Sequence, residues 1–318
     1  MSEQGVKHDC EYDSDPRQNK ELARSLKGKH VLIAGAGRGI GRATAEFFAH
    51  TDISSLNLVA LEIVEVEETA RLARIINPSI TVKSAAFDVR DFDAVHAFVE
   101  GIVHEFGRID VVFMNAGRPP QWLPLHESEP TIWWDTVTVS LQGSFNFARA
   151  AIPFMREASE GGRLIFTSSL GAHLTEGAGS YTIGKLGTTR LAEILHHENK
   201  DVGIKTFSIH PGVINTRFYS DFAHAVEGKL ASDGSSYVSD KVPGDIKSAK
   251  NVVDFFKDKS FDTPQMPAGM VVVLASGRLD FLSGRVARYL ANKEQILRED
   301  IYRVKLIGIN QFLPEWKD

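Results

Sequence analysis

The sequence predicts an α/β fold in which one parallel sheet is doubly wound, with helices on both of its faces. Three observations predict it. Short apolar runs alternate with amphipathic segments of about 10–25 residues, which is the pattern of consecutive βαβ units. A cluster of glycines separates the first apolar run from the first amphipathic segment. The composition of the 318 residues, 43% hydrophobic and 24% charged, is that of a globular protein rather than a disordered or fibrous one.

The alternation of strands and helices begins at His30. The run 31–34 is apolar throughout and ends at Gly35, as expected for a parallel strand buried on both faces. The sequence also indicates where a helix ends: the dipeptide Asn77-Pro78 stops the second predicted helix. The expected strands are residues 31–34, 56–61, 80–87, 110–114, 163–167, 205–209 and 284–290. The expected helices are residues 40–49, 65–76, 91–105, 131–155, 179–199 and 268–275.

The predicted organisation is a single domain over residues 28–295, flanked by two further segments. Residues 1–27 are polar and have no periodic apolar face, so we expect an arm outside the core, and residues 296–318 form a C-terminal extension. Residues 218–268 are rich in Ser, Asp, Lys and Gly and interrupt the alternation. Insertions after the carboxyl ends of parallel strands lie over the ligand crevice, which makes this one a predicted substrate lid.

Charge and cysteine content exclude several classes of protein. With 36 basic and 41 acidic residues the net charge is −5, which argues against binding nucleic acid through phosphates. No run approaches the roughly 18 apolar residues of a membrane span, and the N-terminus does not read as a secretory signal. The single cysteine, Cys10, excludes an internal disulfide and a cysteine-based zinc site. We therefore expect a cytoplasmic protein without nucleic-acid, membrane or metal partners.

The glycine cluster predicts a dinucleotide site. The segment Gly35-Ala36-Gly37-Arg38-Gly39-Ile40-Gly41 lies between a predicted strand and a predicted helix. Bare backbone N–H groups in such a turn approach a diphosphate closely, and the helix adds the positive end of its dipole.

The end of the second strand predicts which dinucleotide binds. An acidic residue there hydrogen-bonds the ribose 2′-hydroxyl and repels a 2′-phosphate. Glu62 follows the apolar run 56–61 and therefore favours NAD over NADP. If Leu61 occupies the reading position instead, Arg38 would face a 2′-phosphate and NADP would be the cofactor.

Two further segments follow predicted strands at the edge where a cofactor would pass. Asp88 follows the third strand and could accept a hydrogen bond from the adenine amino group. Asn115-Ala116-Gly117 follows the fourth strand, and its small residues let the chain pass close to a flat ring.

A tyrosine and a lysine in one helix carry the predicted chemistry. Tyr181 and Lys185 are four residues apart and share a helix face. At about 4 Å an ammonium attracts a phenolate by roughly 4 kcal/mol at an effective dielectric of about 20, so we expect it to lower the tyrosine pKa despite some desolvation. The phenol could then exchange protons near neutral pH. Ser168-Ser169 closes the fifth strand, and a hydroxyl there could bind a substrate oxygen.

Taken together, these motifs resemble the short-chain dehydrogenase/reductase family over about residues 28–295, and the segment 281–285 looks most like filamentous-fungal members. The resemblance implies a Rossmann fold with a seven-stranded parallel sheet. It implies that Tyr181 is the acid–base residue, that Lys185 holds the nicotinamide ribose and lowers the tyrosine pKa, and that Ser169 orients the substrate oxygen. Together with the argument on the second strand, this gives the following candidate cofactor-binding residues: Gly35, Arg38, Gly39, Ile40, Gly41, Glu62, Asp88, Val89, Asn115, Ala116, Gly117, Tyr181, Lys185, Pro211, Gly212 and Thr216.

The sequence departs from the family pattern at two positions. Ser140 stands where the family usually has an asparagine that holds a water for proton relay, and a serine cannot make the same pair of hydrogen bonds. The loop between the serines and the tyrosine is one residue short, so Ser168 is an alternative to Ser169. The family's usual interface uses the long helix and the Tyr–Lys helix, which implies a homodimer or homotetramer.

The predicted function is therefore NAD(P)-dependent interconversion of a secondary alcohol and a ketone, with NAD(H) preferred and NADP(H) as the alternative. Aromatic residues in 218–268 favour a medium-sized hydrophobic substrate of secondary metabolism. One alternative is a non-redox isomerase or cyclase that keeps a bound dinucleotide, which the serine at position 140 would permit. Another is a dinucleotide-sensing protein, which would have no need of an acid–base tyrosine.

Overall fold

The structure, a computed structural model, describes residues 9–121, 123–158, 160–173, 178–215, 254 and 261–288. Within them lies a seven-stranded sheet of order β3-β2-β1-β4-β5-β6-β7, in which neighbouring strands are parallel. The order reverses between β1 and β4, and ligands of open α/β sheets bind at such a switch point. The predicted fold class is confirmed. The strands are β1 (His30–Ala34), β2 (Ser55–Ala60), β3 (Thr81–Ala86), β4 (Val111–Met114), β5 (Arg163–Thr167), β6 (Lys205–His210) and β7 (Arg285–Arg288).

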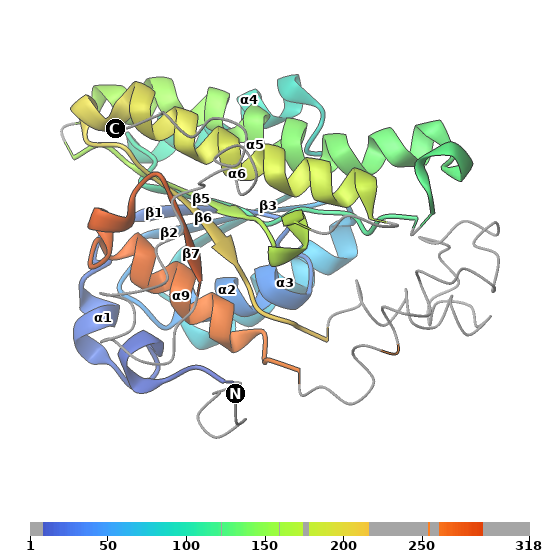
Figure 1. The fold of residues 1–318 in the computed structure, drawn as a ribbon. Helices are drawn as coiled ribbons and strands as arrows, with labels where there is room; N and C mark the ends of the chain where they lie inside the picture. Colours follow the sequence, from blue (N-terminus) through green and yellow to red (C-terminus); the bar gives the residue numbers. More distant parts are fainter. Residues whose placement is uncertain are drawn as a thin grey trace.

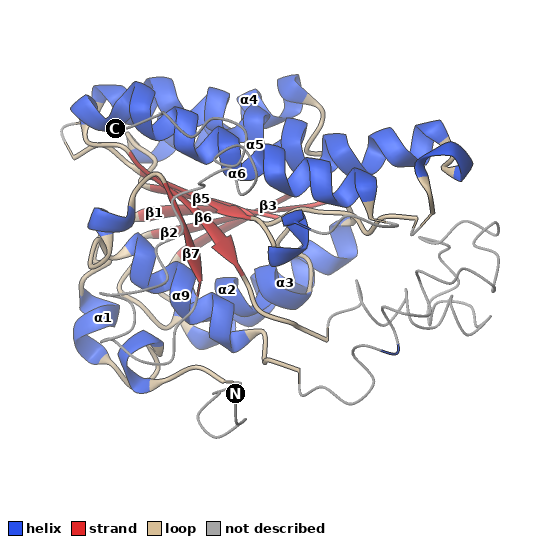
Figure 2. Cartoon of the chain, viewed as in Figure 1, coloured by secondary structure: helices blue, strands red, loops and turns tan. Residues whose placement is uncertain are grey.

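Helices cover both faces of the sheet, as Figure 1 and Figure 2 show. One face carries α4 (Phe92–Phe106), α5 (Pro130–Glu157) and α6 (Gly179–Asn199). The opposite face carries α1 (Lys20–Arg24), α2 (Gly39–Ala49), α3 (Ile63–Ile76) and α9 (Gln265–Ala275).

The apolar strands supply two cores at once. Val31 and Ile33 of β1 pack into the cluster beneath α2 and α9, whereas Leu32 and Ala34 pack into the cluster beneath α4 and α5. Because successive side chains of a strand point to opposite faces, a strand between two helical layers buries side chains on both of its faces, and the run 31–34 of β1 is apolar throughout. This is the reason that the continuous runs in the sequence predicted the sheet correctly.

The N-terminal segment does not lie outside the core, so the expectation of a separate arm over residues 1–27 is wrong for residues 9–27. Leu22 and Leu26 are fully buried in the cluster with α2 and α9. A Cβ on Gly269 of α9 would lie 2.4 Å from Cys10 Sγ, so the two segments are in close contact. Two leucines one helical turn apart are enough to attach a short segment, but too few to show as a periodic apolar face.

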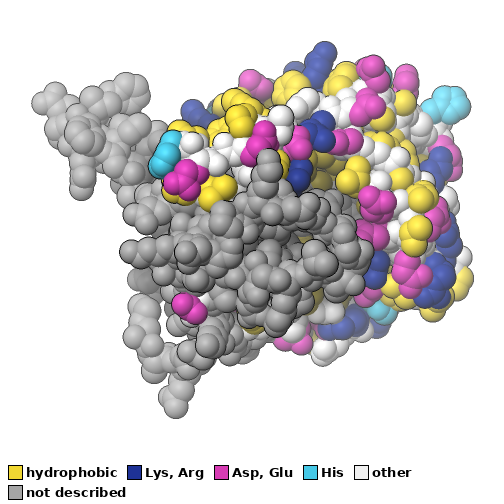
Figure 3. All heavy atoms as spheres, turned by 90° about the vertical axis from the view of Figure 1, so that its right-hand side faces the viewer, with side chains coloured by type: hydrophobic (Ala, Val, Ile, Leu, Met, Phe, Trp, Pro, Cys, Tyr) yellow, Lys and Arg dark blue, Asp and Glu magenta, His cyan; other side chains and the backbone are white. Residues whose placement is uncertain are grey.

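Several predicted segments lie partly or wholly outside the described residues. These are most of the predicted lid, residue 216 and the extension 296–318. The last four residues of the predicted lid, 265–268, belong to α9, which begins at Gln265 rather than at 268. In the described part of the chain no helix has both the length and the apolar character needed to cross a membrane. On the face shown in Figure 3, described acidic and basic side chains are interspersed.

Candidate active site

The glycine turn packs tightly against the ends of two strands. Gly35 and Ala36 both donate backbone hydrogen bonds to the Val59 carbonyl of β2, at 2.8 Å. Gly35 has a φ of +85°, and a Cβ there would lie 2.6 Å from the backbone nitrogen of Ala116. Only glycine permits both this conformation and this approach.

The turn leads directly into the N-terminus of α2. Gly39, Ile40 and Gly41 form its first turn, where backbone N–H groups have no carbonyl partner within the helix. These donors, together with the helix dipole, stabilise an anion such as a diphosphate.

Charged side chains flank the glycine turn on the side of β2. The Arg38 guanidinium pairs with Glu65 of α3, with 3.1 Å between Nη1 and Oε1. Glu62 is exposed at the N-cap of α3, where its side chain makes no capping hydrogen bond, and the adjacent Leu61 is also exposed. Glu65 was not anticipated from the sequence, because its approach to Arg38 depends on how α3 packs beside α2.

Asn115 ties three strand ends together. Its Nδ2 donates to the Gly35 carbonyl at 3.1 Å, and its Oδ1 accepts from Thr167 Oγ1 of β5 at 3.1 Å. Its own backbone N–H bonds to the Ala34 carbonyl of β1. The side chain therefore holds the ends of β1, β4 and β5 in register at the switch point.

The two adjacent serines have different surroundings. The Ser168 hydroxyl is buried and bonds to the Lys185 carbonyl at 3.1 Å and to Thr189 Oγ1 at 2.7 Å, so it faces α6. Ser169 is partly exposed, accepts a hydrogen bond from the Gly171 N–H at 2.9 Å, and is hydrogen-bonded to the side chain of Tyr181.

Lys185 is buried near the tyrosine. Its side chain Nζ donates to the Thr167 carbonyl at 2.7 Å and lies 5.8 Å from the centroid of the Tyr181 ring. Burial lowers the pKa of this ammonium to about 8.

The expected lowering of the tyrosine pKa does not occur in this structure. Burial raises the pKa of Tyr181, and the hydrogen bond with Ser169 opposes that rise only in part. The expectation assumed an ammonium at about 4 Å with its charge little desolvated. Here the same burial that penalises the phenolate also penalises the lysine charge, and Nζ is directed at a carbonyl of β5.

Ser140 and Lys185 both approach Gly117. A Cβ on Gly117 would lie 3.4 Å from Lys185 Nζ and 3.8 Å from Ser140 Oγ, so Gly117 adjoins both groups. The Ser140 hydroxyl is buried and has no hydrogen-bond partner among the described residues. Buried hydroxyls are normally hydrogen-bonded, so this one is available to a further polar group.

The segment after β6 is held by an acid that the sequence did not reveal. Pro211 and Gly212 follow β6, and Gly212 has a φ of +91°. Asp262 Oδ2 accepts from the Val213 N–H at 2.8 Å, and the Asp262 N–H donates back to the Val213 carbonyl at 2.8 Å. Asp262 lies about fifty residues further along the chain, so no local pattern indicated the contact.

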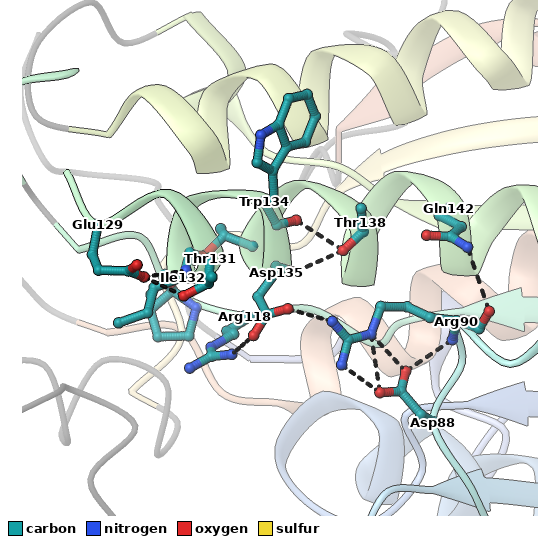
Figure 4. A network of polar contacts seen from close by, with 12 residues as sticks. Asp88, Arg90, Arg118, Glu129, Thr131, Ile132, Trp134, Asp135, Thr138 and Gln142 are labelled. Atoms are coloured by element: carbon teal, nitrogen blue, oxygen red, sulfur yellow. Dashed lines mark hydrogen bonds and ion pairs between the residues drawn. The ribbon is translucent and has the colours of Figure 1, made fainter. Parts of the chain in front are cut away.

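Asp88 belongs to a network of four charged side chains (Figure 4). Arg90 Nε donates to both Asp88 oxygens at 3.0 Å, and Arg90 Nη2 bonds to Oδ2 at 2.6 Å. Arg90 Nη1 also donates to Asp135 of α5, which in turn accepts from Arg118 Nη1 at 2.8 Å. Hydrogen bonding to Arg90 lowers the pKa of Asp88, which keeps the carboxylate charged. Only Asp88 was singled out from the sequence.

These residues fit a nicotinamide dinucleotide. The helix N-terminus and the bare turn provide donors for a diphosphate, and the residues that would hold the rest lie along the same sheet edge. The orphaned Ser140 hydroxyl and the Lys185 ammonium add polar groups beside Gly117. Thr216, which was expected to complete this set, lies outside the described residues.

Comparison with known proteins shows the family of this chain. Residues 29–226 match the short chain dehydrogenase family. The short chain dehydrogenase mpl6 of Monascus purpureus, a filamentous fungus, is 33% identical over 291 residues, covering 88% of this chain and 89% of that protein.

Solved structures share the fold. Levodione reductase superposes with a TM-score of 0.71 at 24% identity, covering 83% of this chain and 96% of that one. NAD+-bound xylitol dehydrogenase superposes with a TM-score of 0.70 at 22% identity, covering 84% and 99%. With the glycine turn and the Ser–Tyr–Lys group on one sheet edge, the family match identifies the chain as a member of the short-chain dehydrogenase/reductase family, and so as an NAD(P)-dependent enzyme.

Proposed function

We propose that this enzyme interconverts a secondary alcohol and a ketone. The observation that carries the proposal is the hydrogen-bonded pair of Ser169 and Tyr181 beside the buried Lys185, on the same sheet edge as the glycine turn. A nicotinamide dinucleotide, when bound, supplies or accepts the hydride.

The side chains of this group would handle the proton. In the reducing direction Tyr181 donates its phenolic proton to the substrate oxygen, and in the oxidising direction it removes that proton. Ser169 donates a hydrogen bond to the same oxygen and so orients it beside the phenol. Its contact with Tyr181 supports Ser169 over Ser168, whose hydroxyl is engaged by α6.

Lys185 and Ser140 would relay protons to and from the tyrosine. With a pKa of about 8 the ammonium can give up and regain a proton near neutral pH. The neighbouring Ser140 hydroxyl can both donate and accept a hydrogen bond, so it is suited to pass a proton onward from the lysine. This would assign to a serine the relay role that an asparagine usually has in this family.

NAD(H) is the proposed cofactor. Arg38, the residue that would attract a 2′-phosphate, is paired with Glu65, so a phosphate would have to displace a carboxylate. Glu62 adds a second acid, which is exposed, near the end of β2. Both features disfavour NADP(H) electrostatically. Double substitution of Glu62→Gln and Glu65→Gln should therefore tighten NADPH binding relative to NADH, and an unchanged ratio would contradict the assignment.

The proposed substrate is a medium-sized hydrophobic ketone or alcohol of secondary metabolism. The support is the aromatic content of residues 218–261, which includes Phe218, Tyr219, Phe222, Tyr237, Phe255, Phe256 and Phe261. A panel of such compounds against small polar alcohols would test it, and a preference for the polar alcohols would refute it.

We also propose that the enzyme is a homodimer or homotetramer built on α5 and α6. Large apolar side chains are exposed on both helices, including Trp134 and Phe145 on α5 and Ile183 and Ile194 on α6. A double change of Trp134→Ser and Phe145→Ser should shift the protein toward monomer in size-exclusion chromatography with light scattering. A wild-type protein that already elutes as a monomer would contradict the proposal.

The decisive experiment is a side-by-side fluorescence titration with NADH and NADPH, followed by turnover assays on the compound panel. We expect tighter binding of NADH, and a loss of turnover by about 10²–10⁴-fold in Tyr181→Phe, because general acid–base catalysis typically contributes that much. Full turnover in Tyr181→Phe would overturn the mechanism. Substrate conversion without any change in nicotinamide absorbance would instead support the non-redox isomerase.

A further inference from the structure

Four charged side chains, Asp88, Arg90, Asp135 and Arg118, form a continuous chain of ion pairs, here called the charged bridge, between the two halves of the proposed cofactor site. Arg90 lies at its centre and bonds Asp88 with two guanidinium nitrogens and with its backbone N–H, which reaches Asp88 Oδ1 at 2.9 Å. A two-pronged arginine–carboxylate contact restricts the orientation of both planes more than a single hydrogen bond does. The Asp88 carboxylate is therefore held in one position at the end of β3.

Helix α5 contacts the turn after β3, which carries Asp88 and Arg90. Asn146 Nδ2 donates to the carbonyls of Val89 and Arg90, both at 3.0 Å. A Cβ on Gly143 would lie 2.7 Å from Val89 Cγ2, so the helix backbone and the turn are in direct contact. Asp135 accepts from Arg90 Nη1 on the same side of the helix, whereas the Trp134 indole points away from the network in Figure 4.

The other end of the bridge lies beside the reacting groups. Asp135 Oδ2 accepts from Arg118 at 2.8 Å, and Arg118 directly follows Gly117. Gly117 is the residue that adjoins Lys185 Nζ and Ser140 Oγ. A single carboxylate on α5 thus joins the turn after β3 to the turn after β4, through one arginine on each.

We propose that Asp135 and Arg90 are positioning residues for dinucleotide binding, with Asp135 setting the Asp88 turn and the Asn115–Arg118 turn relative to each other. The inference rests on the proposed function, because it takes Asp88 as the adenine partner and the turn after β4 as part of the nicotinamide end. It adds two residues to that site that would act without touching the cofactor.

If the charged bridge positions both turns, substitutions along it should affect the binding of two probes, AMP and NADH, differently. AMP reaches only the adenine end, whereas NADH extends over both ends. Arg90→Gln removes the support of Asp88 and should weaken both AMP and NADH by about tenfold, the loss expected for a charge-assisted hydrogen bond. Arg118→Gln should weaken NADH while leaving AMP unchanged. Asp135→Asn should weaken both probes, since it releases both arginines.

The control is a second arginine–aspartate pair in the same protein. Arg163 Nη2 bonds Asp280 Oδ2 at 2.9 Å, and Arg163 is the first residue of β5, at the opposite end of the sheet from the site. Arg163→Gln and Asp280→Asn remove an ion pair of the same type and should leave the affinities for AMP and NADH unchanged. The double variant Arg90→Gln/Asp135→Asn should lose less affinity than the sum of its single changes, because the two side chains act as one unit.

The measurement is fluorescence titration with NADH and competition by AMP, with the thermal midpoint of every variant recorded alongside. Arg90→Lys should restore binding only in part, because a lysine has no fork to hold both Asp88 oxygens. Wild-type affinities in Arg90→Gln and Asp135→Asn would overturn the inference while leaving the proposed function intact. Equal losses of affinity in the Arg163 and Asp280 controls would also overturn the inference, because the cause would then be a general loss of stability. Failure of the wild-type protein to bind either probe would overturn the proposed function and, with it, this inference.

Discussion

The buried ammonium of Lys185, which the proposed mechanism needs, lowers the stability of the folded protein. An ammonium with little exposure to water is destabilised relative to its neutral form, which is why burial lowers its pKa from an ordinary value of 10.5 to about 8. Below pH 8 the folded protein carries the full cost of that charge. Between about pH 8 and 10.5 the unfolded chain holds the proton and the folded protein does not, so stability rises with pH over this window.

Replacing Lys185 with methionine should therefore stabilise the protein at pH 7 while abolishing turnover. The change in pKa corresponds to about 3 kcal/mol, of which about 1 kcal/mol is offset by losing the hydrogen bond to the Thr167 carbonyl. The measurement is urea unfolding at pH 7 and pH 10, and the gain should nearly vanish at the higher pH. Lys27→Met at an exposed lysine is the control and should show no such dependence on pH. A gain that is the same at both pH values would contradict the burial argument.

Ser168 and Ser169, which follow β5, allow a structural role and a catalytic role to be compared at adjacent positions. Ser168→Ala removes a buried hydroxyl with two partners on α6 and should lower the free energy of unfolding by about 1–3 kcal/mol. Ser169→Ala should cost at most about 1 kcal/mol of stability. It should reduce turnover by about 10²–10³-fold, as expected for loss of a donor to the reacting oxygen. Denaturant unfolding and steady-state rates on both variants test the assignment, and the reverse pattern would move the substrate-binding role to Ser168.

At the scale of elements, the N-terminal segment is part of the domain. Helix α1 begins where Asn19 caps it, with the Asn19 side chain accepting from the Leu22 N–H. Leu22 of this helix and Leu26, which follows it, then fill the cluster beneath α9. Asp9 also accepts a hydrogen bond from Thr263, just before α9, at 2.6 Å. The segment thereby supports α9.

Leu22→Ala should consequently lower the free energy of unfolding by about 2–5 kcal/mol, the range for truncating a fully buried leucine. Lys20→Ala, on the exposed side of the same helix, is the control and should change stability little. Chemical denaturation of both variants provides the test. Equal, small effects would mean that the segment is an independent arm after all.

At the scale of the whole molecule, cofactor binding and folding are linked. The glycine turn, Asn115 and the charged bridge join the ends of strands that unfold together, so a ligand held across them binds only the folded chain. A ligand at about one hundred times its Kd adds about 2.7 kcal/mol to the free energy of unfolding.

Thermal unfolding with NADH and NADPH at equal concentration should therefore show a rise of several degrees in the midpoint, larger for NADH. AMP should also raise the midpoint, by less. A larger rise with NADPH would mean that a 2′-phosphate displaces Glu65 from Arg38. No rise with any of the three would contradict the site itself.

Much of this protein was determined locally and could be predicted from its sequence. The strands buried on both faces appear as continuous apolar runs, as in β1 and β5, because a parallel sheet between two helical layers has no polar face. The glycine turn and the Tyr181–Lys185 spacing could be identified because a tight turn and one helical turn each involve only a few neighbouring residues.

Groups that are distant in the chain meet through the packing of whole elements, which no local pattern records. Asp135 joins Arg90 to Arg118, Asp262 holds the turn after β6, and Leu22 packs beneath α9. Burial also reversed the expected direction of the tyrosine pKa. Spacing along the chain records which residues share a face of one element. It does not record which elements pack together or how far water is excluded between them, and these determine ion pairing and the cost of a buried charge.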